Sequence, residues 1–215
     1  MESAFCEIVP PDCRLIETFR YTPGFGAVDL GLHLNRMCDS ARKLGFVFDR
    51  DLAEHICDGL SGNKPLRCRL TLGIKGDLQL SHVPLDPTPA VWQVDISDTR
   101  LNTGDAWLAH KTTQRDIYDT ARANLPRGID EVLFLNERNE LCEGTITNVF
   151  VETQDGLWIT PPISAGCLPG ILRQKLIKSG DVTVKTVTLG DLMAARSVMV
   201  GNSLRGKIRA ELNRA

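Results

Sequence analysis

The sequence lacks the runs and clusters that mark several large classes of protein. Its 215 residues contain no apolar run long enough to span a membrane, and residues 1–11 show no signal-peptide pattern. Lysines and arginines are scattered among acidic residues, and the formal net charge is −2. A basic surface for nucleic acid or for anionic lipid is therefore not expected. A small-molecule partner and a cytoplasmic location are predicted.

Histidine is scarce, and cysteine does not occur in close pairs. The chain has 4 histidines and no HExxH, GxSxG, GxGxxG or GxxxxGK[ST] pattern. A histidine-centred hydrolase or a three-histidine metal site therefore has little support. The 7 cysteines include no CxxC pair, so no structural zinc site is expected. We predict free, mostly buried thiols in a reducing compartment and no bound metal.

What the chain does contain is enough apolar material for a core, since 42% of its residues are hydrophobic. Alternating and helical spacings predict an α+β unit over residues 1–100. The polar residues 98–107 resemble a linker to a larger C-terminal domain over residues 107–215. In the N-terminal domain, strands are predicted at 14–20, 66–72, 78–80 and 91–96, and helices at 30–44 and 51–60.

The second half of the chain continues with strands and helices in mixed order. Strands are predicted at 131–135, 147–152, 157–160, 182–188 and 197–200, and helices at 113–125, 170–179 and 189–196. Strands return through short turns as often as through helices. Mixed or largely antiparallel sheets with flanking helices are therefore expected, rather than a doubly wound parallel sheet.

Four segments carry groups suited to catalysis or anion binding. Lys111 follows the apolar residues 107–109 at a helix start, where partial burial would make its amine nucleophilic. Glu143 precedes a glycine and small hydroxyl residues, a place where a carboxylate can pair with a cationic ligand. The turn 166–170 leads into a helix whose first N–H groups can bind an anion, and the polar loop 201–206 can add contacts. Each segment alone is also explained by a solvated side chain, a turn or a plain loop.

Taken in order, these segments resemble the fold-type IV enzymes, which use pyridoxal 5′-phosphate (PLP). This family includes branched-chain and D-amino acid aminotransferases and aminodeoxychorismate lyase. The resemblance implies a two-domain, D-amino acid aminotransferase-like α+β fold with the cofactor between the domains. The matching blocks are Glu17-Thr18, His33–Arg36 with Ser40-Ala41, His110–Thr112, Glu143–Phe150, Thr160-Pro161 with Leu168–Arg173, and Asn202–Arg205.

The resemblance also implies roles for individual residues. Lys111 would form the Schiff base with PLP and move the substrate proton, and Glu143 would bind the ring nitrogen. His33 would order the phosphate site. The implied phosphate ligands are Arg36, the backbone N–H groups of Ile171 and Leu172, and Ser203. The chain departs from the aminotransferases at Leu172, where they usually have threonine.

Within the family, residues 110–113 with Arg115 and Tyr118, and residues 201–206, are most similar to aminodeoxychorismate lyase. That similarity implies conversion of 4-amino-4-deoxychorismate to 4-aminobenzoate and pyruvate, a step of folate biosynthesis. Arg115 and Arg205 are then candidates for the substrate carboxylates, on charge and position alone. The alternatives are a branched-chain or D-amino acid aminotransferase that uses the same Lys111, and a non-catalytic PLP-binding protein. Because the family is usually dimeric, a homodimer is predicted.

Overall fold

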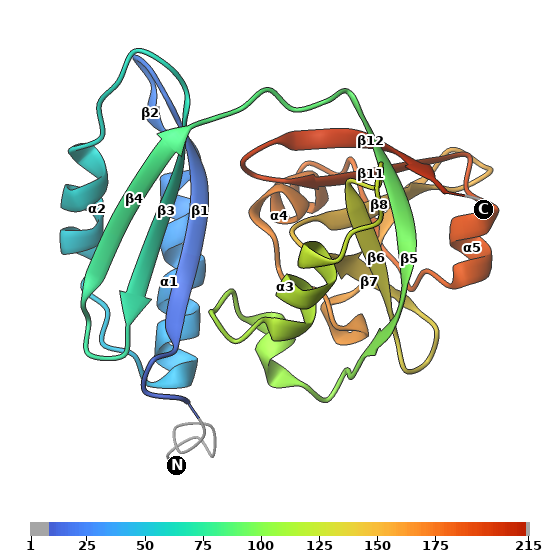
Figure 1. Cartoon of the computed structure of the whole chain (residues 1–215), viewed down its shortest axis with the longest axis horizontal. Helices are drawn as coiled ribbons and strands as arrows, with labels where there is room; N and C mark the ends of the chain where they lie inside the picture. The colour runs from blue at the N-terminus through green and yellow to red at the C-terminus, as the bar shows by residue number, and fades with distance from the viewer. Residues whose placement is uncertain (1–8, 214–215) are drawn as a thin grey trace. The chain divides into compact units, whose positions relative to one another are not determined.

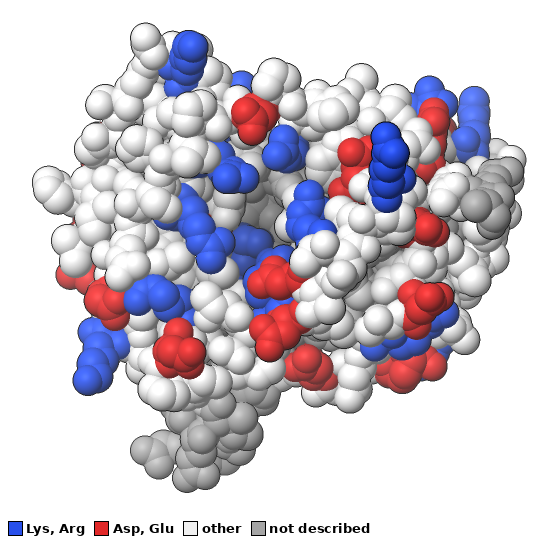
Figure 2. Space-filling view, in the orientation of Figure 1, with Lys and Arg blue, Asp and Glu red and all other residues white. Residues whose placement is uncertain are grey.

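The computed structural model describes residues 9–213 and divides them into two compact units. Unit 1 comprises the described chain up to Pro87 and the segment His110–Gln114. Unit 2 comprises Thr88–Ala109 and the chain from Arg115 onward. Figure 1 shows the elements of both units, and Figure 2 shows basic and acidic side chains interspersed on one face of the surface.

Unit 1 is an antiparallel sheet in the order β2-β1-β3-β4, with α1 covering one face (Figure 1). The apolar stripe of α1 explains this packing, because Leu34, Met37, Ala41 and Leu44 recur at helical spacing and are all buried. The elements are β1 (Arg14–Thr22), β2 (Gly26–Ala27), α1 (Leu30–Leu44), α2 (Arg50–Asp58), β3 (Leu66–Gly73) and β4 (Leu78–Pro84).

The register between β1 and β3 sorts their side chains onto two faces. Glu17 lies opposite Leu70 and Phe19 opposite Cys68, and all four are buried. Phe19 and Glu17 both contact His33 of α1, so this is the face that the helix covers. Because side chains alternate along a strand, the even-numbered residues of β1 lie on the other face.

The segment His110–Gln114 extends this sheet along the free edge of β1. The Ile16 N–H donates to the Lys111 carbonyl at 2.8 Å, and the Thr113 N–H donates to the Arg14 carbonyl at 2.9 Å. These bonds flank an antiparallel bridge between Leu15 and Thr112. Lys111 therefore belongs to unit 1, and not to the C-terminal domain that was predicted to carry it.

Unit 2 is built on a mixed sheet in the order β10-β9-β8-β11-β12-β5-β6-β7. Strands β5 and β6 are parallel, as are β12 and β5, whereas β8 and β11 are antiparallel. The prediction of mixed sheets is confirmed. The elements are β5 (Val91–Leu101), η1 (Ala106–Ala109), α3 (Asp116–Ala123), β6 (Glu131–Asn136), β7 (Leu141–Gly144), β8 (Asn148–Glu152), β9 (Trp158–Thr160), η2 (Ile163–Ala165), α4 (Ile171–Lys178), β10 (Thr183–Val184), α5 (Leu189–Met193), β11 (Ser197–Asn202) and β12 (Gly206–Leu212).

The domain boundary differs from the predicted one because of β5. This strand was placed in the N-terminal domain, but Trp92 and Val94 pair with β12 and belong to the main core of unit 2. The boundary therefore lies after Pro87, and residues 98–101 are strand rather than linker.

Several segments differ from their predicted secondary structure, and β2 and β7 were not predicted as strands. The strand predicted at 182–188 shortens to β10, while β12 was not predicted, although Ile208 and Ala210 bury one of its faces. Helix α3 begins at Asp116 rather than Thr113, because the preceding residues pair with β1.

The sequence also predicts free, mostly buried thiols and no segment that spans a membrane. The cysteines of the described range are free thiols, and five of these six are buried. Cys6 lies outside the described residues. No helix between residues 9 and 213 combines the length and apolar character that a membrane crossing needs.

Candidate active site

Backbone hydrogen bonds hold Lys111 beside β1, and the pairing register shows from which face of the sheet its side chain projects. Because Ile16 lies directly opposite Lys111, the two side chains project from the same face of the sheet, away from α1. That face also carries Arg20 of β1 and two arginines of β3, namely Arg67 opposite Arg20 and Arg69 opposite Thr18. Arg20 is half-buried, and its Nε has no hydrogen-bond partner. Arg14, whose Nε donates to Thr71 Oγ1 of β3 at 3.0 Å, lies on this face as well, so an amine and four guanidinium groups share one face of unit 1.

Arg36, the predicted phosphate ligand, forms part of a buried ionic cluster on the α1 side. Its Nε donates to Glu17 Oε1 at 2.8 Å and its Nη2 donates to Oε2 at 2.6 Å. His33 Nδ1 contacts the same Oε2 at 2.6 Å. Burial raises the pKa of Glu17, but the Arg36 charge and the hydrogen bonds from His33 and Arg36 outweigh it and lower that pKa to about 2.

His110, which precedes Lys111, is held by a side-chain contact with α1. His110 Nδ1 lies 2.9 Å from Ser40 Oγ of α1. Burial, followed by the charge of Lys43, lowers the pKa of His110, so the neutral ring is favoured. Together with the backbone pairing of Thr112, this bond holds the segment around Lys111 from both sides.

In unit 2, Glu143 is a buried carboxylate near the end of β7 with an ordered set of donors. Tyr118 Oη donates to its Oε1 at 2.7 Å, and the Leu168 N–H donates to Oε2 at 3.0 Å. Asn148 Nδ2 lies 3.4 Å from the same Oε2. Hydrogen bonds of this kind stabilise the ionised form of a carboxyl group. Both carboxylate oxygens of Glu143 thus have donors, and its contact with a cofactor ring nitrogen remains a prediction.

Tyr118 is a contact that the sequence did not predict. It lies on α3, its ring meets Phe134 edge-on with centroids 5.3 Å apart, and the Arg115 guanidinium lies 5.5 Å from its centroid. Burial, together with the neighbouring Glu143 charge, raises the pKa of Tyr118, so its hydroxyl stays a donor. In the sequence, Tyr118 stands out only as part of the block that resembles aminodeoxychorismate lyase, with no role assigned to it.

The predicted anion-binding turn leads into α4, as expected. Gly170 is the N-cap, and Ile171 and Leu172 are the first helical residues, whose N–H groups have no partner within the helix. A Cβ at position 170 would collide with Asn148 Oδ1, so glycine is required for this close approach. A Cβ on Gly201 would lie 2.8 Å from Leu172 Cδ2, which places β11 directly against the start of α4.

Ser203 lies in the turn between β11 and β12, and Asn202 shapes that turn. Asn202 Oδ1 accepts from the N–H groups of Leu204 and Arg205 at 3.1 and 3.0 Å, and its Nδ2 donates to the Ile146 carbonyl at 3.1 Å. The turn containing Ser203 is thereby tied to the loop after Glu143. The phosphate contact of Ser203 remains a prediction.

The two arginines proposed for substrate carboxylates both have structural partners in unit 2. Arg115 donates from Nε to Asp119 at 2.8 Å and from Nη2 to the Thr145 carbonyl at 2.9 Å. Arg205 donates to Thr88 Oγ1 at 3.1 Å and lies 5.9 Å from the centroid of the Trp92 ring. Their substrate contacts remain predictions.

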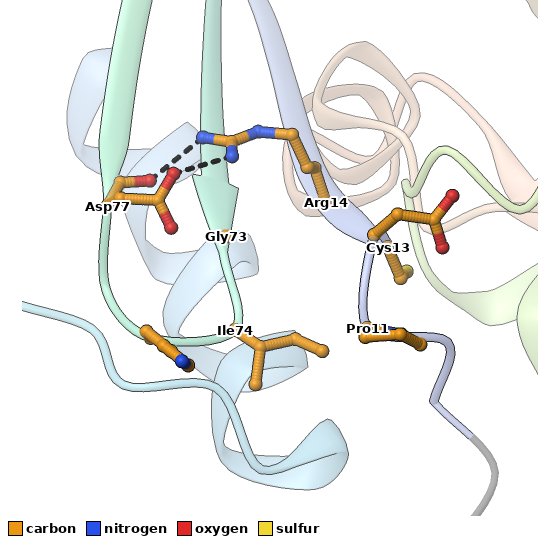
Figure 3. Close-up of a pocket in the computed structure, with 8 residues that line it drawn as sticks. Pro11, Cys13, Arg14, Gly73, Ile74 and Asp77 are labelled. Atoms are coloured by element: carbon orange, nitrogen blue, oxygen red, sulfur yellow. Dashed lines mark hydrogen bonds and ion pairs between the residues drawn. The ribbon is translucent and has the colours of Figure 1, made fainter.

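A surface pocket in unit 1 contains none of the predicted site residues (Figure 3). Arg14 crosses it and donates to Asp77 at 2.6 Å. The lining residues are Pro11, Asp12, Cys13, Arg14, Gly73, Ile74, Lys75 and Asp77.

Comparison with known families identifies the group to which this arrangement belongs. The model of the amino-transferase class IV family matches residues 14–211. The chain belongs to the class IV aminotransferase family. The match includes both β1 with its ionic cluster and the strands and helix that surround Glu143, so the resemblance found in the sequence is confirmed.

Individual members of the class IV family resemble the chain to different extents. A provisionally named amino-acid aminotransferase from Mesorhizobium loti has 42% identity and a TM-score of 0.88, covering 94% of this chain and 100% of that one. The aminodeoxychorismate lyase of Saccharomyces cerevisiae is 32% identical over 136 residues, which are 55% of this chain and 36% of the yeast protein. A provisionally named aminodeoxychorismate lyase from Schizosaccharomyces pombe is 29% identical over 70% of this chain and 68% of its own length. The match thus spans about a third of the yeast lyase.

Proposed function

We propose that this chain is a PLP-dependent lyase that converts 4-amino-4-deoxychorismate to 4-aminobenzoate and pyruvate. The buried Glu143 carboxylate with its three donors is the observation that carries the cofactor assignment. A pyridine nitrogen needs such an anion to stay protonated. The uncapped first turn of α4, packed against Gly201, supplies N–H groups of the kind that bind phosphate.

The residues present therefore fit PLP, which supplies an electron sink for charge that develops at the substrate carbon bearing nitrogen. Lys111 would hold the cofactor aldehyde and afterwards move the proton at that carbon. Glu143 would bind the ring nitrogen. The proposed phosphate ligands are the N–H groups of Ile171 and Leu172, Ser203, and Arg36, whose Nε and Nη2 bind Glu17 in this structure.

The arginines on the sheet face that carries Lys111 favour a substrate with more than one carboxylate. Arg20, Arg67 and Arg69 share the face of the unit 1 sheet that carries Lys111. Guanidinium groups bind carboxylates in bidentate geometry, and a sheet face that carries several of them is poorly suited to an aliphatic side chain. 4-Amino-4-deoxychorismate carries two carboxylates, which matches this face better than a branched-chain amino acid does.

An aminotransferase is the second candidate, and the similarity to the Mesorhizobium loti protein over its full length favours it. In that case the same Lys111 and Glu143 would act on an amino acid, with a 2-oxo acid as acceptor. Both candidates use the same cofactor residues, so the choice between them depends on substrate.

The decisive experiment combines labelling with two assays. Borohydride reduction of the PLP-loaded protein followed by peptide mapping should place the label on Lys111. Release of 4-aminobenzoate and pyruvate from aminodeoxychorismate supports the lyase, whereas amino-group transfer to 2-oxoglutarate supports the aminotransferase. Lys111→Ala should lose both label and turnover, and Lys75→Ala, a change at an exposed lysine, should lose neither. A label on another residue, or no bound PLP, would refute the cofactor assignment. Protein that is labelled at Lys111 but shows neither activity would be a non-catalytic PLP-binding protein.

Two further properties belong to the proposal. We expect a cytoplasmic homodimer, as the family resemblance and the free thiols of the described range suggest. Sedimentation analysis of the PLP-loaded protein at several concentrations tests the dimer, and a monomer at all concentrations would contradict it.

A further inference from the structure

Glu131, the first residue of β6, is a fully buried carboxylate that the proposed chemistry does not use. Its side chain is 0% exposed. An ionised carboxyl group removed from water is costly unless hydrogen bonds or opposite charges surround it. The partners of Glu131 therefore indicate what this buried carboxyl group does.

Most of these partners come from three consecutive residues of the loop between β7 and β8. Thr145 donates to Oε1 from its N–H at 3.0 Å and from its Oγ1 at 2.5 Å. The Ile146 N–H and Thr147 Oγ1 donate to Oε2 at 3.2 and 3.1 Å. Arg122 Nη1, at 3.6 Å, adds the opposite charge. One carboxylate thus organises the whole loop.

The same carboxylate explains the glycine and the hydroxyl residues of the motif that follows Glu143. A Cβ on Gly144 would lie 2.8 Å from both Cγ and Cδ of Glu131, so position 144 has no room for a side chain. The hydroxyl groups of Thr145 and Thr147 point at Glu131 and are used there. In the sequence, these hydroxyl groups suggested a ligand site.

The loop held by Glu131 connects several groups of the proposed cofactor site. Glu143 precedes it and Asn148, which contacts Glu143, follows it. The Gly144 N–H donates to the Thr147 carbonyl at 2.8 Å and closes the loop. The Ile146 carbonyl anchors Asn202, whose side chain shapes the turn that contains Ser203. A displaced loop would move all these groups together.

We propose that Glu131 is a positioning residue for the cofactor site, acting through residues 145–147 on Glu143, Asn148 and the turn of Ser203. It does not itself touch the cofactor or the substrate. The loss of cofactor affinity expected below rests on the proposed function. The hydrogen-exchange measurement does not, because it is made on the cofactor-free protein.

The first test replaces the carboxylate with a group of the same shape. In Glu131→Gln, the amide NH₂ would face N–H and O–H donors, so the loop loses acceptors. In the cofactor-free variant, amide hydrogen exchange should become at least tenfold faster at Thr145, Ile146 and Leu168, the last because its N–H bonds to Glu143. PLP affinity should fall roughly tenfold or more, since hydrogen bonds to a charged group are strong. Glu140→Gln, at a half-buried, ion-paired glutamate of the same unit, is the control and should change neither quantity.

A second pair of variants tests the proposal if Glu131→Gln fails to fold. Thr147→Val removes one donor to Glu131 and should increase exchange at Leu168 and weaken PLP binding, while Thr147→Ser keeps the hydroxyl and should restore both. Wild-type exchange at Leu168 in folded Glu131→Gln or in Thr147→Val would overturn the positioning role. If the variants alter exchange but the wild-type protein binds no PLP, the positioning role is supported and the cofactor assignment is wrong.

Discussion

At the scale of single residues, the hydroxyl of Tyr118 offers the sharpest test of the donor set around Glu143. Tyr118→Phe keeps the ring against Phe134 but removes the 2.7 Å hydrogen bond. A hydrogen bond to a charged group contributes about 1.5–3 kcal/mol, so kcat should fall about tenfold or more. KM should change little, because the carboxylate acts on the cofactor.

The control for this change is the chain's other tyrosine, since the sequence has 2. Tyr21→Phe, in β1, makes the same chemical change and should leave kcat near the wild-type value. The pH dependence of the absorbance of bound PLP should shift in Tyr118→Phe and not in Tyr21→Phe. Equal behaviour of the two variants would contradict the assignment.

The β3 arginines on the sheet face that carries Lys111 lead to a prediction about substrate specificity. Arg67→Gln and Arg69→Gln, on the polar face of β3, should raise KM for a dicarboxylate substrate about tenfold each, because each removes a charged hydrogen-bond donor. PLP affinity should not change. Arg42→Gln, at an exposed position of α1, is the control. An unchanged KM in both β3 variants would leave the aminotransferase as the better candidate.

Glu17 leads to a prediction about acid stability. Its pKa of about 2 in the folded chain lies below the ordinary value of 4.5, so its ionised form adds stability above pH 4.5 that is lost as pH falls toward 2. The shift corresponds to about 3 kcal/mol. Urea unfolding at several pH values should show a smaller loss of stability over this range in Glu17→Gln. Glu54→Gln, in a half-exposed ion pair, should keep the wild-type slope.

At the scale of helices and strands, local pattern predicted what local interactions determine. The helix predicted at 30–44 has these bounds in the structure, because its apolar stripe is regular and Gly45 ends it at a φ of 75°. The strand predicted at 182–188 is shorter in the structure, because only Thr183 and Val184 pair with β9 and Thr188 forms no more than an isolated bridge with Glu140. Pairing with a distant strand leaves no signal in the local sequence.

The start of α4 shows how one element constrains another. Gly170→Ala would place a Cβ against Asn148 Oδ1, displacing a side chain that contacts both Glu143 and the Leu168 carbonyl. We expect a loss of about 1–3 kcal/mol in unfolding free energy and weaker PLP binding. Gly190→Ala, in α5, meets nothing closer than 3.6 Å and should leave both unchanged. Calorimetry and a PLP titration measure the two effects, and a Gly170→Ala protein with wild-type affinity would refute the expected coupling.

At the scale of the whole molecule, the motifs predicted Lys111 and Glu143 as cofactor residues but placed Lys111 in the C-terminal domain, whereas it belongs to unit 1. The assignment depends on the backbone bond between Ile16 and Lys111, which joins residues far apart in the chain. The role of Glu131 was missed for the same reason, because its partners lie at positions 145–147. Local motifs indicate candidate functional residues, whereas the contacts that hold those residues depend on pairing between distant segments of the chain.

The division of the proposed cofactor residues between the units predicts coupled unfolding. Arg36 and Lys111 belong to unit 1, and Glu143 belongs to unit 2. A ligand that binds the folded state stabilises it by about 2.7 kcal/mol at 100 times its dissociation constant. PLP should therefore raise the stability of both units in a concentration-dependent way.

The tryptophans make this coupling measurable. All 3 tryptophans, Trp92, Trp107 and Trp158, lie in unit 2, so their fluorescence follows that unit, while far-UV circular dichroism follows both. With PLP bound, the two thermal transitions should coincide and move up together. Lys111→Ala should reduce the shift seen by both probes, although the lysine belongs to the unit without tryptophan. If PLP moved only the fluorescence transition, cofactor binding would involve unit 2 alone, and the proposed role of Lys111 would be wrong.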